Sequence, residues 1–157
     1  MEVFLEQFIP SDRSKKISEM LKNIAIGCGV AAVITIFGSP IIGIAFGILG
    51  GGFFVGSYLM YVDYEYELYN GNITISKVYN ASRRKVAQKI EKDAVRRVYH
   101  TDGKDASPKG ITAYYNTKLD GLKIYTFELN NNKIIQVALN AELERIVKII
   151  YAQTMTL

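Results

Sequence analysis

The chain has 157 residues, of which 49% are hydrophobic and 22% charged, and its formal net charge is +4. This length allows one small domain beside a membrane segment. The single cysteine, Cys28, excludes a disulfide framework and a thiolate metal cluster, and the single histidine, His100, excludes a His-rich metal site. We therefore expect neither a metal nor a cofactor.

The amino-terminal third contains a long uncharged segment. From Ile24 to Val62 there is no Asp, Glu, Lys, Arg or His. Because about 20 apolar residues cross the hydrocarbon core of a bilayer, this segment is too long for one span. Gly38-Ser39-Pro40 interrupts it, and proline is well tolerated in the first turn of a helix. The sequence predicts a two-helix transmembrane hairpin over residues 14–62, with its turn at 38–40.

Residues 1–13 are predicted to be a cytoplasmic or interfacial segment. Phe4, Leu5 and Phe8 would share one face of a short helix that lies on the membrane or packs against the rest of the protein. A cleaved signal peptide is the competing interpretation of the first apolar stretch. The mixed charges before that stretch, and the second apolar stretch directly after it, argue against cleavage.

Basic residues indicate the orientation of the predicted hairpin. Arg13, Lys15 and Lys16 lie at its amino-terminal end, Arg83 and Arg84 follow it, and the turn between the helices is uncharged. Lys and Arg gather on the cytoplasmic side of membrane helices. We expect a multi-pass protein of the cell membrane with both termini in the cytoplasm.

Small residues recur every four positions in both predicted helices. Such stripes let helix backbones approach closely in lipid. The stripes could pack within one hairpin, or glycines such as Gly52 and Gly56 could contact another protomer or subunit. The residues predicted to pack helices are Gly27, Ala31, Ser39, Gly43, Gly47 and Gly51.

After Asp63 the pattern alternates with a period of two, which indicates strands. Asn70-Gly71 is typical of a two-residue hairpin turn. In the strand around residues 84–90, Val86 and Ile90 are expected to point inward. Asn140 is a good N-cap for an amphipathic carboxyl-terminal helix. Seven antiparallel strands are expected, over residues 64–68, 73–79, 84–90, 94–99, 111–115, 122–129 and 133–139.

Seven strands followed by one helix is the order of a pleckstrin-homology-like (PH-like) fold. The whole chain resembles small bacterial membrane proteins in which a two-helix hairpin precedes such a domain. The resemblance rests on Tyr64-Glu65-Tyr66-Glu67-Leu68, the Asn-Gly turn and Arg83-Arg84-Lys85. It implies an α+β architecture in which residues 63–157 form a PH-like barrel or sandwich capped by the last helix.

Basic residues after the hairpin are candidates for lipid contact. PH domains often bind phosphoinositide heads through basic residues of the first hairpin and its loop, and the comparable residues here are Lys77, Arg83, Arg84 and Lys85. Cations near the cytoplasmic leaflet gain about 1 kcal/mol each from anionic lipid. The alternative is that they only set the orientation and solubility of the protein. No recognition motif accompanies the charge, so nucleic acid is not expected as a partner.

No catalytic motif is present, neither a Gly-rich phosphate loop nor a nucleophile elbow. Asp93, Asp102 and Asp105 are near His100 in the sequence, but loop solvation explains them more simply than a hydrolytic site. We therefore expect a non-enzymatic scaffold or accessory subunit, with an anionic-lipid sensor as the alternative and a membrane enzyme as the least favoured. Its expected partners are membrane lipids and a second protomer or another membrane protein.

Overall fold

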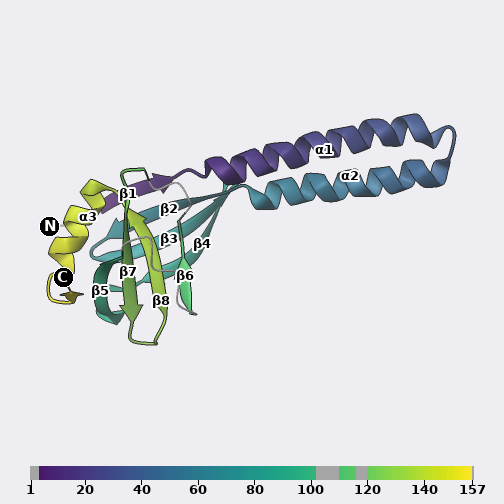
Figure 1. The fold of residues 1–157 in the computed structure, drawn as a ribbon. Helices are drawn as coiled ribbons and strands as arrows, with labels where there is room; N and C mark the ends of the chain where they lie inside the picture. Colours follow the sequence, from purple (N-terminus) through teal and green to yellow (C-terminus); the bar gives the residue numbers. More distant parts are fainter. Residues whose placement is uncertain (1–3, 102–109, 116–119, 157) are drawn as a thin grey trace. The chain divides into compact units, whose positions relative to one another are not determined.

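The computed structural model describes residues 4–101, 110–115 and 120–156 (Figure 1). The chain divides into two units, which are described separately. The hairpin unit comprises residues 11–62 and 78–83, and the strand unit comprises residues 1–10, 63–77 and 84–157. The sheet containing the first four strands therefore has residues in both units.

The hairpin unit contains two helices, α1 (Asp12–Ile36) and α2 (Pro40–Met60). The Ser11 side chain caps α1 by accepting a hydrogen bond from the Ser14 N–H at 3.2 Å. The N–H groups of Gly38 and Ser39 both donate to the Thr35 carbonyl, which ends α1, and Pro40 begins α2. The connection between the two helices therefore consists of residues 37–39.

A seam of small buried residues joins α1 and α2. Ser18 and Ala25 are the buried residues of α1, and those of α2 are Gly43, Gly50 and Ser57. The spacing of seven, two helical turns, is that of helices that wind closely around each other. A Cβ atom at Gly43 would lie 2.8 Å from the Ile36 Cα, and one at Gly50 would lie 3.2 Å from the Ala25 carbonyl oxygen. Only glycine permits this approach.

The members of the predicted small-residue stripes have different surroundings. Gly43 contacts α1, and Ala31 and Ser39 are half-buried. A Cβ atom at Gly27, Gly47 or Gly51 would meet nothing within 4 Å. Gly50, which the stripe omitted, is the second close contact. Contact of the open glycines, Gly52 and Gly56 among them, with another protomer or subunit stays a prediction.

The outer surface of the hairpin is apolar. Both helices are long and apolar enough to cross a membrane, and few of their residues are buried. Exposed apolar surface on this scale marks contact with a membrane or another protein. The two helices therefore suggest membrane association. The exposed side chains include Ile26, Val33, Ile34, Phe37, Ile41 and Ile48.

Two sheets and a carboxyl-terminal helix make up the rest of the fold (Figure 1). The first sheet has the order β1-β2-β3-β4, with β1 Phe4–Ile9, β2 Val62–Tyr69, β3 Asn72–Tyr79 and β4 Arg83–Ile90. The second has the order β6-β8-β7-β5-β9, with β5 Val95–Thr101, β6 Ile111–Ala113, β7 Lys123–Leu129, β8 Ile134–Leu139 and β9 Met155–Thr156. A short 3₁₀ turn, η1 (Lys92–Ala94), precedes β5, and α3 spans Ala141–Ile150.

The strand pattern differs from the expected one in number and direction. The described residues contain each of the seven expected strands, with boundaries shifted by a few residues, and also β1 and β9. Two pairs, β5–β9 and β6–β8, are parallel, so the second sheet is mixed. Residues 102–109, which include Asp102 and Asp105, lie outside the described residues.

The expected helix at the amino terminus is wrong, because residues 4–9 form strand β1. Leu5, Gln7 and Ile9 face inward with a period of two, and β1 pairs antiparallel with β2 from Phe4↔Tyr69 to Ile9↔Tyr64. This pairing gives backbone N–H and C=O groups of β1 their hydrogen-bond partners. The spacing of apolar residues within one segment cannot reveal such a pairing. The hairpin α1–α2 is consequently inserted between two paired strands.

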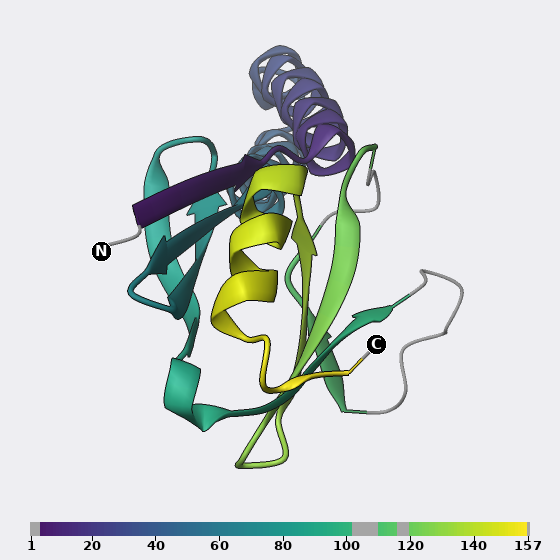
Figure 2. The same cartoon turned by 90° about the vertical axis from the view of Figure 1, so that its left-hand side faces the viewer.

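The core of the strand unit lies between the two sheets and beneath α3. Leu143, Val147 and Tyr151 of α3 are buried in it, and Figure 2 shows α3 in front of the space between the sheets. The predicted N-cap is confirmed, since the Asn140 side chain accepts a hydrogen bond from the Leu143 N–H at 2.8 Å. Ile90 is buried as expected, but Val86, in the same edge strand β4, is 61% exposed, so the expectation that it lies in the core is wrong.

Candidate functional site

A pocket with a volume of about 600 Å³ opens in the strand unit between β5, β7, β9 and α3. We call it the β5–α3 pocket. This volume lies within the range of about 300–1,000 Å³ that is usual for small-molecule sites. Its lining residues are Arg97, Tyr99, His100, Lys123, Tyr125, Glu128, Glu144, Lys148 and Met155.

One carboxylate organises the α3 side of this pocket. Glu144 Oε1 accepts hydrogen bonds from Lys148 Nζ at 2.6 Å, Tyr125 Oη at 2.9 Å and Lys123 Nζ at 3.0 Å. The Lys148 hydrogen bond, with those of Lys123 and Tyr125, outweighs burial and lowers the pKa of Glu144 to about 2. The same contact raises the pKa of Lys148. Glu144 and Lys148 therefore stay charged at neutral pH, and the hydrogen bonds of Glu144 join α3 to β7.

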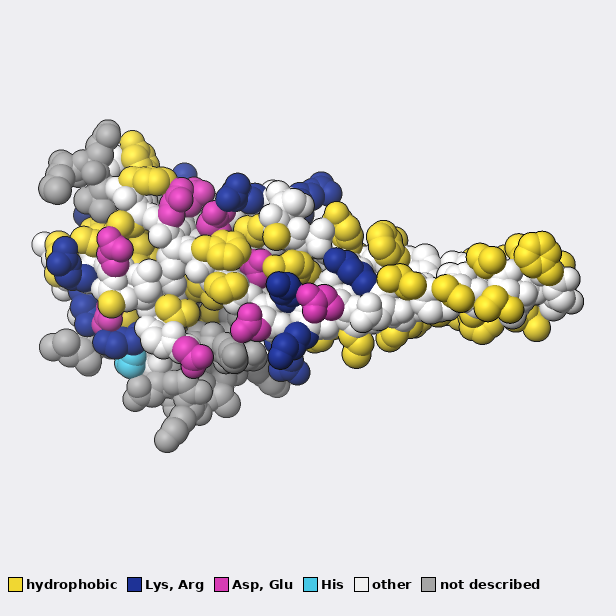
Figure 3. Space-filling model, turned by 90° about the horizontal axis from the view of Figure 1, so that it is seen from above, with side chains coloured by type: hydrophobic (Ala, Val, Ile, Leu, Met, Phe, Trp, Pro, Cys, Tyr) yellow, Lys and Arg dark blue, Asp and Glu magenta, His cyan; other side chains and the backbone are white. Residues whose placement is uncertain are grey.

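The β5 side of the pocket combines aromatic rings with further charges. The His100 and Tyr125 rings meet edge to face, with centroids 5.5 Å apart, and the Arg97 guanidinium lies 6.0 Å from the Tyr99 ring centroid. The Arg96 guanidinium binds Glu128 at 3.1 Å. In Figure 3 dark-blue Lys and Arg side chains gather beside the cyan histidine. The pocket therefore offers cationic and aromatic groups together.

A second surface is the outer face of β1 and β2, formed by residues that point away from the core. We call it the β1–β2 outer face. Phe4 is paired with Tyr69, and Glu6 with Glu67. Phe4, Phe8 and Tyr69 are 58%, 52% and 49% exposed. Like charges directly opposite each other in an antiparallel pair are destabilising, and large exposed aromatic side chains are enriched at interfaces.

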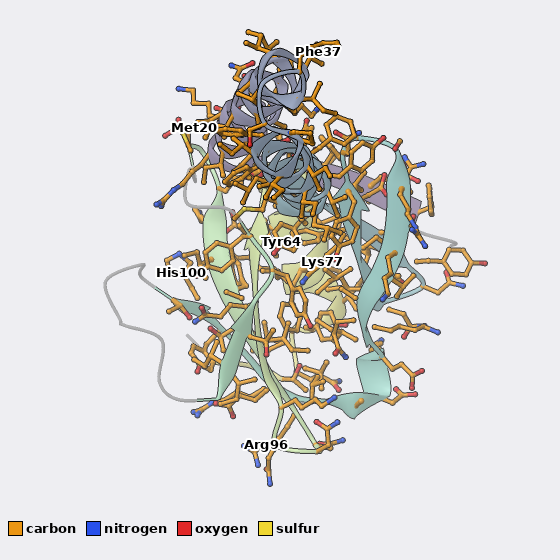
Figure 4. All side chains as sticks on the ribbon, turned by 90° about the vertical axis from the view of Figure 1, so that its right-hand side faces the viewer. Met20, Phe37, Tyr64, Lys77, Arg96 and His100 are labelled. Carbon is orange, nitrogen blue, oxygen red and sulfur yellow. The ribbon has the colours of Figure 1, made fainter. Side chains whose placement is uncertain are left out.

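The basic residues predicted to contact lipid are not gathered in one arrangement. Arg84 binds Glu65 through two hydrogen bonds, at 2.7 and 3.2 Å, and this contact raises the pKa of Arg84. Lys77 is half-buried and lies on the same side of β3 as the core residues Ile73 and Ile75; in Figure 4 it lies between the sheets near Tyr64. Lys85 is exposed in the strand unit, and Arg83 is exposed in the hairpin unit.

A buried polar network fills part of the interior between the sheets. The Tyr66 hydroxyl donates to the Tyr114 carbonyl and accepts from the Ala138 N–H at 3.3 Å, and burial raises the pKa of Tyr66. Gln136 accepts from the Tyr115 hydroxyl and donates to Thr126. These tyrosines pack in the interior of the strand unit, and Tyr66 is fully buried in the core.

Among the described residues no group of three or more His, Cys, Asp and Glu is placed to hold a metal ion. The sequence did not identify the β5–α3 pocket as a site. The sequence does contain one local signal of this site. Glu144 and Lys148 are four residues apart in the predicted helix, a spacing that places two side chains next to each other. Lys123, Tyr125 and His100 are distant from α3 in the sequence, and only the packing of α3 on β7 and the pairing of β7 with β5 bring them to the pocket.

Comparison with known proteins identifies a family. The sequence model of a family described as "Bacterial PH-like domain (DUF6106)" matches residues 1–153. That range includes both units of the structure, the apolar hairpin as well as the two sheets. Searches of curated proteins and of solved structures give no match.

Proposed function

The chain belongs to the bacterial PH-like domain family DUF6106, and from this premise we propose that it is a non-enzymatic interaction module held at the cytoplasmic face of the cell membrane by its helical hairpin. PH-like domains are generally non-enzymatic. The role proposed is that of a scaffold or accessory subunit that binds another membrane protein.

The β1–β2 outer face is the observation that carries this proposal. Phe4, Phe8 and Tyr69 expose aromatic surface on either side of the acidic pair Glu6 and Glu67. A partner segment with Lys or Arg between apolar residues would cover the aromatic rings and relieve the repulsion between the two carboxylates. Arg84 supplies one cation nearby, but it already binds Glu65. The surface therefore favours a basic, apolar protein segment.

The connections between the hairpin and the adjoining strands are short. Only Pro10 and Ser11 separate β1 from α1, and only Tyr61 separates α2 from β2. Within the hairpin unit, the Ser14 hydroxyl donates to the Val62 carbonyl at 3.2 Å, and the Asn80 N–H donates to the Tyr61 carbonyl at 2.9 Å. Neither connection has the length of a flexible linker.

The alternative function, an anionic-lipid sensor that uses Lys77, Arg83, Arg84 and Lys85, has less support. Arg84 is engaged by Glu65, and Lys77 lies on the inner side of β3. Charge reversal distinguishes the two functions. The scaffold requires Glu6 and Glu67, whereas the lipid sensor requires Arg83 and Lys85.

The test is purification of the full chain from its own membranes in a non-ionic detergent, with any bound membrane protein identified. Phe4→Ala/Phe8→Ala and Glu6→Lys/Glu67→Lys should each release a partner held by the β1–β2 outer face. Ile149→Ala, which truncates another exposed apolar residue (66%), should retain it. Retention of every partner by both double variants would refute the scaffold role of this face.

Orientation is tested separately. In a Cys28→Ser background, a cysteine in place of Gly38 should react with an impermeant maleimide added to intact cells. A cysteine in place of Asn131 should react only after the membrane is permeabilised. The reverse pattern would place the strand unit outside the cell and contradict the proposed location.

A further inference from the structure

We propose that the β5–α3 pocket binds a phosphomonoester, whose phosphate is held by Lys123 and Lys148. This site differs from the basic residues predicted from the sequence and from the β1–β2 outer face. It adds a ligand to the interaction module, and it does not depend on the identity of a protein partner.

The two lysines carry more charge than the carboxylate they share. Lys123 and Lys148 both bind the single atom Glu144 Oε1, at 3.0 and 2.6 Å. One carboxylate compensates one ammonium group, so one positive charge of this trio remains. Each ammonium group has three N–H donors, of which the contact with Glu144 uses one. Donors and charge therefore remain for an incoming anion.

The exposure of these groups determines which of them a ligand meets. The Glu144 side chain is only 10% exposed, whereas the side chains of Lys123 and Lys148 are 55% and 49% exposed. An anion entering the pocket meets the two ammonium groups, while the carboxylate lies beneath them. Because Glu144 remains ionised, it fixes both ammonium groups at one place instead of leaving them free in solvent.

The remaining walls indicate an organic phosphate. The wall also contains Arg97 and Glu128, and the Glu128 carboxylate is paired with Arg96. The rings of Tyr99, His100 and Tyr125 together with Met155 provide surface for an apolar or hydroxylated body. A volume of about 600 Å³ is much larger than a phosphate ion needs. A small phosphate ester uses both the cations and the rings. Its source is either a soluble metabolite or the head group of a lipid such as phosphatidic acid.

The test measures binding of sn-glycerol 3-phosphate to the full chain in non-ionic detergent by calorimetry at constant ionic strength. We expect saturable binding. Lys123→Gln/Lys148→Gln should weaken it at least about tenfold, because the variant removes two charge-assisted hydrogen bonds to the phosphate. The control Lys89→Gln/Lys133→Gln removes the same charge from exposed positions outside the pocket and should change the affinity less than about twofold.

A single-residue variant controls for misfolding of the double variant. Lys123→Gln leaves the Glu144–Lys148 pair in place, and it should weaken binding while the circular dichroism spectrum stays unchanged. Absence of saturable binding to the wild-type chain would overturn the proposal. Equal weakening by the two double variants would also overturn it, because the attraction would then be non-specific.

Lipid as the source is examined in mixed micelles. If the ligand is a lipid head group, phosphatidic acid in the micelle should bind more tightly than glycerol phosphate in solution, and Lys123→Gln/Lys148→Gln should abolish the difference. If the ligand is soluble, phosphatidic acid and phosphatidylcholine micelles should leave glycerol phosphate binding unchanged. Either result supports the pocket. Loss of phosphate binding in these variants with the protein partner retained would separate this site from the proposed scaffold role.

Discussion

Lys148 Nζ lies 2.6 Å from Glu144 Oε1, one turn further along α3, and the same oxygen accepts the Tyr125 hydroxyl of β7. The ion pair is thus both a local helix contact and a link to the sheet. Surface pairs at this spacing contribute only about 0.3–0.5 kcal/mol. Here the carboxylate is largely covered, so its loss should affect the whole strand unit.

The first prediction concerns acid stability. The pKa of Glu144 is about 2 in the folded chain, below the value of about 4.3 for an unperturbed glutamate. A lowered pKa contributes stability that is present above the unfolded value and is lost as the pH falls through the folded value. The thermal midpoint should therefore decrease from about pH 5 to pH 2, as measured by circular dichroism. Glu144→Gln should lower the midpoint at pH 7 and flatten this part of the profile, whereas the exposed Glu142→Gln should leave the profile unchanged.

The second prediction separates the glycines of α2. Gly43→Leu and Gly50→Leu should disrupt the hairpin, because a Cβ atom at Gly43 would already collide with α1 and one at Gly50 would be crowded by it, so neither position has room for a Leu side chain. Gly47→Leu and Gly51→Leu should leave the hairpin intact, since a Cβ there meets nothing within 4 Å. Disulfide crosslinking between cysteines placed on α1 and α2 reports the hairpin, and native electrophoresis reports assembly. If Gly47→Leu/Gly51→Leu leaves the size of the complex unchanged, these glycines do not join protomers.

The third prediction concerns the buried seam of the hairpin. Ser18 is 1% exposed, and its hydroxyl has no hydrogen-bond partner among the described residues. An unsatisfied buried hydroxyl costs about 1–3 kcal/mol, so Ser18→Ala should raise the thermal midpoint in detergent. Ser57→Ala is the matched control. Its hydroxyl donates to the Phe54 carbonyl at 2.6 Å, so its removal should not stabilise the hairpin. A lower midpoint for Ser18→Ala would contradict this account of the seam.

The fourth prediction concerns the turn between β3 and β4. Asn80 and Ala81 have φ angles of 48° and 56°, in the left-handed region that alanine avoids by roughly 1–2 kcal/mol. Ala81→Gly should therefore stabilise the protein by about 1 kcal/mol in equilibrium unfolding. The opposite result is expected for Gly71→Ala in the preceding turn. There φ is +86° and a Cβ would lie 3.0 Å from Lys92 Cδ, so this variant should be destabilised. Equal effects of the two substitutions would contradict these turn conformations.

The sequence alone indicated the elements whose cause is local. The absence of charge from Ile24 to Val62 and the break before Pro40 identified the two apolar helices. Alternation and the Asn70-Gly71 turn identified β2 and β3, and Asn140 identified the start of α3. These features depend on residues close together in the chain, where periodicity, turn conformation and capping act directly.

Tertiary structure decided the features whose cause lies far away in the chain. β1 is a strand because β2, beyond the whole hairpin, pairs with it. Gly43 and Gly50, rather than an unbroken stripe, touch α1 because the crossing of two helices selects one face of each. The β5–α3 pocket exists because α3 packs on β7, which brings Lys123 to Glu144 and Lys148. Pairing and packing depend on contacts between distant segments, and neither residue type nor spacing along one segment encodes them.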